Sequence, residues 1–226
     1  MPEPIRIDVI TIFPAMLAGF LGESMLKRAA DMGAVRFQTV NLRDFTSDRH
    51  QTVDDRPYGG GPGMIMKAEP LFKAVESLRT PGTRVILMSP QGSRFDQGKA
   101  RELANASHLV FVCGHYEGID ERVSEALVSD EISIGDYILT NGTLAATVVI
   151  DAVVRLLPNV LGGDGATEEE SFDNGRLEYP QYTRPEVFRE MRVPEVLLSG
   201  DHSAVRLWRD EQARQRTKVR RPDLMQ

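Results

Sequence analysis

The stretch Ser133-Ile134-Gly135-Asp136-Tyr137-Ile138-Leu139-Thr140-Asn141-Gly142 joins a short apolar segment to a long apolar one. Small, apolar and polar residues alternate in it, and a glycine stands near each end. This is typical of a tight, irregular loop, because glycine permits backbone conformations and close approaches that a side chain blocks. Such a loop can wrap a ligand with main-chain groups. An ordinary turn after a strand has the same composition, and the stretch taken alone favours that simpler interpretation.

Strands and helices are expected to alternate on both sides of this loop. Apolar and β-branched runs predict strands, and apolar residues at helical spacing predict helices. This alternation predicts an α/β fold. The strands are expected at residues 5–12, 35–40, 84–88, 109–113 and 131–134, and the helices at 15–26, 69–79, 96–106, from 121 onward and 143–157.

Three glycine-marked turns follow three of these strands, at residues 89–92, 114–118 and 135–142. Open α/β sheets bind their ligands at the carboxyl ends of the strands. The pattern therefore predicts one adenosine-like ligand, held by backbone groups from several loops.

Length and composition indicate an ordinary globular protein. The chain has 226 residues, of which 41% are hydrophobic and 27% charged, so it can hold one large domain or a medium domain with an appendage. No apolar run is long enough to span a bilayer, and the first residues lack the pattern of a signal peptide. We therefore expect a cytoplasmic protein without membrane contact. The single cysteine, Cys113, excludes an internal disulfide and ends an apolar run, so it is expected to be buried.

The charge is unevenly distributed along the chain. A net charge of −6 argues against a protein that binds nucleic acid over its whole surface. Residues 206–221 nevertheless contain seven basic and two acidic residues, a local charge of +5. A solvated helix face and a phosphate-binding patch both fit this pattern.

Two further segments have chemistry that a simple scaffold does not require. Asp54-Asp55-Arg56-Pro57-Tyr58-Gly59-Gly60-Gly61-Pro62-Gly63-Met64 is the densest glycine cluster, yet it fits neither the phosphate-loop nor the dinucleotide pattern. A flexible linker is the simplest interpretation, but the aromatic ring and the prolines stiffen the segment. The expected helix at 143–157 is apolar nearly all round, and its only charged residues are Asp151 and Arg155. These two residues form either a local ion pair, or a site in which Arg155 binds a ligand and Asp151 supports the helix.

The motifs together resemble those of a known family. The sequence is similar to the bacterial tRNA (guanine-N1)-methyltransferases, the TrmD family of the SPOUT class, over nearly the whole chain and in the family's order. The resemblance rests on Ile12-Phe13-Pro14, the glycine cluster at 54–64, Ser89-Pro90-Gln91-Gly92, residues 113–123, Ser133-Ile134-Gly135-Asp136-Tyr137, Tyr182-Thr183-Arg184-Pro185 and Leu197-Leu198-Ser199-Gly200.

This resemblance implies a SPOUT-type α/β fold with a deep trefoil knot and a small C-terminal helical domain. The implied division is a knotted S-adenosylmethionine-binding domain at 1–160, a linker at 161–174 and a tRNA-binding domain at 175–226. It also implies a homodimer with its active site at the subunit interface. The implied contacts to S-adenosylmethionine are Leu87, Ser89, Pro90, Gly114, Tyr116, Glu117, Ile134, Gly135, Tyr137, Leu139 and Gly142.

The implied reaction is methylation of N1 of guanosine 37 in tRNA, immediately 3′ of the anticodon, which helps to maintain the reading frame. That nitrogen carries a proton, so the reaction needs a general base and a group that stabilises charge on O6. The family's pattern assigns these roles to Glu170 and Arg155, although Glu168 and Glu169 stand beside Glu170 in the sequence. The guanine is expected to lie beside Asp55, Tyr58, Gly59 and Gly60.

Magnesium is also implied for methyl transfer, but the sequence shows no cluster of carboxylates for an all-protein metal site. Two alternatives remain: a knotted methyltransferase that acts on another RNA position, and a regulatory module that binds S-adenosylmethionine without catalysis. A retained arginine with a nearby carboxylate favours the enzyme, because a regulatory module that only binds S-adenosylmethionine needs neither residue.

The segment 140–145, Thr-Asn-Gly-Thr-Leu-Ala, departs from the family's common Ser-Gly-Gly-Glu-Leu-Pro. Contacts made through the main chain tolerate this change better than side-chain contacts do.

Overall fold

The computed structural model describes residues 3–162, 170–172 and 174–225. The chain divides into two compact units, Met1–Leu161 and Gly162–Gln226, and each is described by itself. The elements of the first unit are β1 (Ile5–Thr11), α1 (Ala15–Leu21), α2 (Ser24–Asp31), β2 (Val35–Asn41), a 3-10 turn at Leu42–Phe45, β3 (Asp54–Asp55), β4 (Ile65–Met66), α3 (Ala68–Leu78), β5 (Arg84–Arg94), α4 (Gln97–Ala104), β6 (His108–Cys113), α5 (Glu121–Leu127), β7 (Asp130–Ser133) and α6 (Gly142–Val154).

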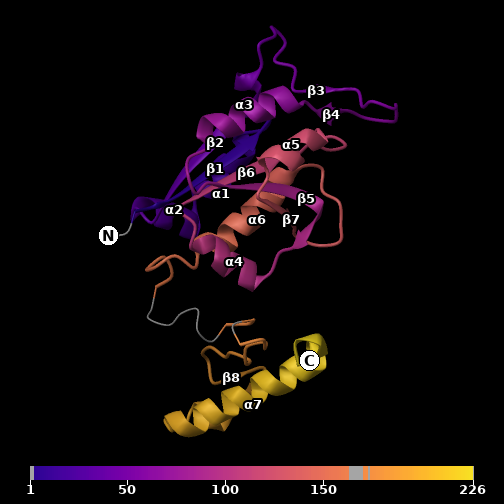
Figure 1. The fold of residues 1–226 in the computed structure, drawn as a ribbon. Coiled ribbons are helices and arrows are strands. Elements are labelled where there is room, and N and C mark those ends of the chain that lie inside the picture. Colours follow the sequence, from indigo (N-terminus) through magenta and orange to yellow (C-terminus); the bar gives the residue numbers. More distant parts are fainter. Residues whose placement is uncertain (1–2, 163–169, 173, 226) are drawn as a thin grey trace. The chain divides into compact units, whose positions relative to one another are not determined.

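A parallel five-stranded sheet lies at the centre of the first unit, in the order β2-β1-β6-β5-β7 (Figure 1). Helices α2, α4 and α6 pack on one face of the sheet, and α3 and α5 pack on the other. Strand β6 is buried along its whole length, as expected for a central parallel strand that is covered on both faces. The expectation of an α/β fold is thereby confirmed at the level of a mixed α/β fold with a central parallel sheet.

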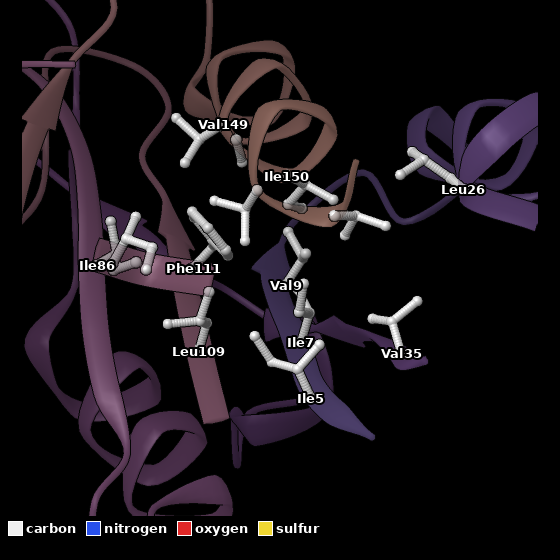
Figure 2. Close-up of a cluster of buried hydrophobic side chains, with 14 of the residues drawn as sticks. Ile5, Ile7, Val9, Leu26, Val35, Ile86, Leu109, Phe111, Val149 and Ile150 are labelled. Atoms are coloured by element: carbon white, nitrogen blue, oxygen red, sulfur yellow. The ribbon is translucent and has the colours of Figure 1, made fainter. Parts of the chain in front are cut away.

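Helix α6 supplies much of the first face of the core. Figure 2 shows Val149 and Ile150 of this helix packed above Phe111 of β6 and Val9 of β1. All four side chains are almost fully buried. Burial of side chains of this size contributes about 1.5–3 kcal/mol each, so α6 is a principal source of the unit's stability.

The structure differs from the sequence-based expectation at two places. The single helix expected at 15–26 is wrong: the chain breaks into α1 and α2, and Ser24 takes a positive φ of 52°. The turn expected at 89–92 lies inside β5. Met88 and Ser93 both pair with Ile132 of β7, so the residues between them bulge out of the ladder while the strand continues.

Polar side chains are buried near the amino ends of the strands. Asp8 of β1 accepts a hydrogen bond from Arg6 (3.1 Å) and lies 2.9 Å from Nε2 of His108, whose Nδ1 lies 2.7 Å from the Thr83 hydroxyl. A buried carboxylate is tolerated only with such partners. This network therefore stabilises the end of the sheet opposite to the three glycine-marked loops.

The second unit contains a hairpin of β8 (Val187–Phe188) and β9 (Met191–Arg192), a 3-10 turn at Glu195–Leu197, the long helix α7 (His202–Arg220) and a 3-10 turn at Pro222–Met225. Asp201 caps α7 by accepting hydrogen bonds from the backbone N–H groups of Ser203 and Ala204. Within the described residues, every helix is too short or too polar to cross a membrane.

The bulge in β5 depends on a glycine, and alanine there is expected to destabilise the protein. A Cβ on Gly92 would lie 2.4 Å from the backbone carbon of Glu131, so the backbone of Gly92→Ala must shift. We expect a loss of about 1–3 kcal/mol in the free energy of unfolding, the usual cost of overpacking. Urea unfolding followed by far-ultraviolet circular dichroism measures it.

Gly19→Ala is the matched control, because Gly19 lies in α1 with no atom within 4 Å of the added Cβ. This change is expected to be neutral or to stabilise by up to about 1 kcal/mol, the helix propensity difference. Equal unfolding midpoints for the two variants would contradict the proposed contact.

Candidate functional site

A cavity of about 520 Å³ opens beside the bulge in β5 and the ends of β6 and β7. Its walls come from the bulged part of β5 and from the segments that follow β6 and β7, close to the carboxyl-end position expected for a ligand site of an open α/β sheet. It lies within the size range of small-molecule sites. All eleven residues expected to contact S-adenosylmethionine line it: Leu87, Ser89, Pro90, Gly114, Tyr116, Glu117, Ile134, Gly135, Tyr137, Leu139 and Gly142.

The loop at 134–142 closes the cavity by returning to the end of β6. The backbone N–H of Gly142 donates a hydrogen bond to the carbonyl of Gly114 (2.8 Å). A Cβ on Gly142 would lie 3.1 Å from the Cα of Cys113, so a side chain would widen this contact. Asn141 then caps α6 by accepting from the backbone N–H of Thr143 (2.9 Å). The loop end and the helix start are thus fixed together.

Two residues of the cavity wall hold unusual backbone conformations. Tyr116 has a φ of 60°, which is uncommon for a residue with a side chain. Gly135 has a φ of 147°, and a Cβ there would lie 2.6 Å from the ring of Tyr137. Strained conformations of this kind concentrate at ligand sites, because the surrounding structure must hold them.

The glycine cluster forms the tip of a hairpin made by β3 and β4, which projects from the body of the first unit (Figure 1). Asp55 ends β3, and Tyr58 is fully exposed; Gly59 and Gly60 both have positive φ. None of these four residues lines the cavity, whereas Ile65, at the base of the hairpin, does.

Backbone hydrogen bonds join the base of this hairpin to the cavity. The N–H of Glu117 donates to the carbonyl of Met64 (3.1 Å), and the N–H of Met66 donates to the carbonyl of Gly118 (2.9 Å). Gly63 lies against the Glu117 side chain, which a Cβ would approach to 2.4 Å. A shift at Gly63 would therefore be transmitted to the 114–118 segment of the cavity wall.

His115 is a cavity residue that the sequence analysis did not assign to the site. Its ring packs edge-on against Phe13 (5.2 Å between ring centroids) and Tyr116 (4.6 Å). Its Nδ1 is buried and has no hydrogen-bond partner among the described residues. The sequence offers a signal for this position, because His115 stands between two expected contact residues, Gly114 and Tyr116.

The proposed catalytic pair is divided between the two units. Arg155 follows α6 directly, and its backbone N–H donates to the carbonyl of Asp151 (3.2 Å). Glu170 belongs to the second unit, where it lines a pocket beside α7. Glu168 and Glu169 lie outside the described residues. The described residues contain no group of three or more His, Cys, Asp or Glu side chains placed to bind a metal ion.

The thiol of Cys113 is excluded from chemistry by its surroundings. Cys113 is buried at the end of β6, as expected from the sequence, and burial raises the pKa of its thiol to about 12. The thiolate is the reactive form of cysteine. The thiol therefore stays protonated and unreactive near neutral pH.

We accordingly expect native protein at pH 8 to resist a chromogenic thiol reagent under conditions in which free cysteine, with a pKa of about 8.5, reacts readily. Protein unfolded in guanidinium chloride should react with one equivalent. Native labelling at the rate of free cysteine would show instead that the thiol is accessible.

Comparisons with known proteins agree with this architecture. The model of the family described as tRNA (Guanine-1)-methyltransferase TrmD matches residues 5–226. Three relatives carry the name tRNA (guanine-N(1)-)-methyltransferase. The protein of Moorella thermoacetica is 58% identical over 224 residues, covering 97% of this chain and 90% of the relative. The protein of Anoxybacillus flavithermus is 56% identical over 224 residues, with coverages of 98% and 91%. The protein of Geobacillus kaustophilus is 54% identical over 222 residues, with coverages of 97% and 91%. On this evidence the chain belongs to the TrmD family of tRNA (guanine-N1)-methyltransferases.

Proposed function

We propose that this chain transfers a methyl group from S-adenosylmethionine to N1 of guanosine 37, immediately 3′ of the tRNA anticodon. The observation that carries the proposal is the cavity beside the β5 bulge and the ends of β6 and β7, because all eleven residues expected to contact the methyl donor line it in a member of this family. The enzyme would act in the cytoplasm, where its tRNA substrate resides, and would help to maintain the reading frame.

The cavity has features that suit S-adenosylmethionine. Its volume of about 520 Å³ suits a ligand of this size, and its walls present main-chain groups of glycine-containing loops next to apolar side chains such as Leu87 and Leu139. Gly135 and Gly142 let the cavity wall pack closely, because a Cβ would crowd the Tyr137 ring at Gly135 and the backbone of Cys113 and Gly114 at Gly142. When bound, S-adenosylmethionine supplies a methyl group activated by its sulfonium charge.

The proton chemistry is assigned to the two charged residues. Glu170 would accept the proton from N1 of guanine, and Arg155 would stabilise the negative charge that develops on O6. Glu168 and Glu169 remain alternatives for the base, because they adjoin Glu170 in the sequence.

An exposed apolar stripe supports the homodimer. Helix α6 exposes Leu144 and Val148, and Asp151 and the half-buried Arg155 continue the same face at helical spacing. Met16 and Phe20 of the adjacent α1 are also exposed. A contiguous apolar surface rimmed by charged groups is typical of an interface between proteins. A dimer formed through this stripe would bring Arg155 to the subunit boundary, where Glu170 of the other subunit would meet it.

The path of the chain supports the knot. After β7 at the edge of the sheet, the chain returns past β5 to the end of β6, where Gly142 bonds to Gly114. Ser93 and Arg94 of β5 pair with Ile132 and Ser133 of β7, and Gly92 in the bulge lies close to the backbone of Glu131. Chains rarely thread through their own loops, and a trefoil knot is an exception to this rule. Here it would arise from passage of the segment 134–142 through the loop formed by residues 89–94.

The basic helix and the exposed hairpin tip are assigned to tRNA. Helix α7 contains most of the +5 charge of residues 206–221, so RNA affinity should fall with rising salt. Tyr58, fully exposed between Asp55 and the glycines, would border the target guanine, which an unpaired loop can present. The described residues contain no cluster of carboxylates that could bind magnesium without other ligands. A magnesium ion would therefore take its ligands mainly from water and substrate phosphates.

The function is tested by transfer of labelled methyl from S-adenosylmethionine to an anticodon stem-loop transcript, with guanosine or adenosine immediately after the anticodon. We expect the wild type to require guanosine. Glu170→Gln should lose about 10²–10⁴-fold in kcat, the usual contribution of a general base. Glu186→Gln, an exposed change in the same unit, should retain activity.

The other outcomes separate the alternatives. Methylation of a different RNA in place of the guanosine transcript would indicate another RNA position as the target. Binding of S-adenosylmethionine without transfer to any RNA would indicate a regulatory module. Full activity in Glu170→Gln with loss in Glu169→Gln would move the base to Glu169.

The link between the hairpin and the cavity gives a second test. Gly60 and Gly63 both have positive φ, so alanine strains both, but only Gly63 adjoins Glu117. Gly63→Ala should weaken S-adenosylmethionine binding, measured by calorimetry, by about ten-fold, or roughly 1.4 kcal/mol. Gly60→Ala should preserve this affinity while weakening tRNA binding. Equal loss of S-adenosylmethionine affinity in both variants would show that backbone strain, and not the Glu117 contact, matters.

A further inference from the structure

The second unit contains a pocket of about 580 Å³ between helix α7 and a wall formed by Glu170 and residues 174–179. Its wall on the helix includes His202, Arg206, Arg209 and Ala213, which share one face at helical spacing. The opposite wall includes Glu170 and Tyr179. The lining as a whole combines an aromatic ring with three arginines and three carboxylates: Tyr179; Arg176, Arg206 and Arg209; and Glu170, Glu178 and Asp210.

Several contacts fix the opposite wall on the helix. The backbone N–H of Leu177 donates to the hydroxyl of Thr217 (2.9 Å), and Thr217 is fully buried. Arg176 pairs with Asp210 (2.7 Å), which neutralises one cation of the pocket. The guanidinium of Arg209 lies 4.6 Å from the centre of the Tyr179 ring. The pocket is thus built by tertiary contacts within one unit.

Arg209 is the residue that points to a ligand. Its Nε is buried and has no hydrogen-bond partner among the described residues, although a buried donor is normally paired. The contact with Tyr179 holds the guanidinium over the ring, and a planar guanidinium is suited to bind phosphate or a base edge. A bound oxygen or ring nitrogen would satisfy the open donor.

We propose that this pocket binds an unpaired nucleotide of the substrate RNA, adjacent to the one that is methylated, with Arg209 as the recognition residue. The inference rests on the proposed function, because Glu170, the proposed base, lines the same pocket. Proteins bind unpaired nucleotides by combining aromatic or guanidinium stacking with basic groups, and this pocket contains both. A nucleotide held there would position the anticodon loop relative to the Glu170 carboxylate.

The first test is equilibrium binding of the full-length protein to a fluorescent anticodon stem-loop by anisotropy, without S-adenosylmethionine. The variants are Arg209→Gln, Arg209→Lys and the control Arg214→Gln, an exposed arginine of α7 outside the pocket. We expect both changes at Arg209 to weaken binding about ten-fold more than the control, because lysine restores the charge but not the planar fork. S-adenosylmethionine affinity should not change, and RNA binding is compared well below the thermal unfolding midpoint of every variant. Wild-type affinity in Arg209→Lys, or equal losses in Arg209→Gln and Arg214→Gln, would overturn the proposal.

The second test locates the nucleotide. Stem-loops with a single abasic position in the loop are bound by wild type and by Tyr179→Leu. We expect one position, next to guanosine 37, at which removal of the base weakens binding by the wild type but has little further effect on binding by Tyr179→Leu. The free-energy effects of changing two groups that contact each other are not additive. Additive effects at every position would refute a base-binding pocket. Coupling at guanosine 37 itself would overturn the assignment to a neighbour. Because these readouts are binding alone, a wild type that binds RNA but does not methylate it would refute the proposed function without affecting this test.

Discussion

The hydrogen bond from the N–H of Gly142 to the carbonyl of Gly114 is the constraint on which the first unit depends. It joins the end of β6 to the start of α6, across a sheet in which β5 separates β6 from β7. Glycine favours this close approach, because a Cβ at Gly142 would lie 3.1 Å from the Cα of Cys113 and would push the two segments apart. Since α6 begins at this residue, the same contact fixes the register in which Val149 and Ile150 cover the sheet. The contact between Gly142 and Gly114 therefore positions both the cavity wall and a large part of the core.

This contact explains how the irregular loops around the cavity can form an ordered binding site. Tyr116 and Gly135 hold conformations that an isolated peptide would rarely adopt, and each costs conformational free energy. Burial of the apolar face of α6 supplies the compensating free energy, because that helix cannot dock unless the 134–142 loop has returned to β6. A wall made largely of main-chain groups also tolerates side-chain changes. This accounts for a cavity of the expected lining in a chain whose 140–145 segment departs from the family's common pattern.

The features that sequence predicted well are those set by local pattern. The apolar run that ends at Cys113 predicted a buried strand, and glycines after strands predicted a ligand site at their ends. The errors arose where distant contacts override local preference. The continuation of β5 through residues 89–92 depends on pairing with Ile132, and the edge-on packing of His115 depends on Phe13, about a hundred positions earlier. The break before Ser24 is a backbone conformation that the helical spacing of apolar residues did not reveal.

The two kinds of ligand place opposite demands on the chain, and the two units meet them separately. A small, flexible methyl donor is best held by preorganised main-chain groups, since these lose little conformational entropy on binding. A polyanionic RNA is attracted by charge, and its affinity then depends on salt. In this chain the backbone-lined cavity belongs to the first unit, whereas the basic helix α7 and the pocket with Arg209 belong to the second. An acidic protein can therefore bind RNA, because positive charge is concentrated in helix α7, in the same unit as the proposed base, Glu170. Under the proposed assignment, the unit that binds the RNA would also present the carboxylate, which would couple substrate recognition to removal of the N1 proton.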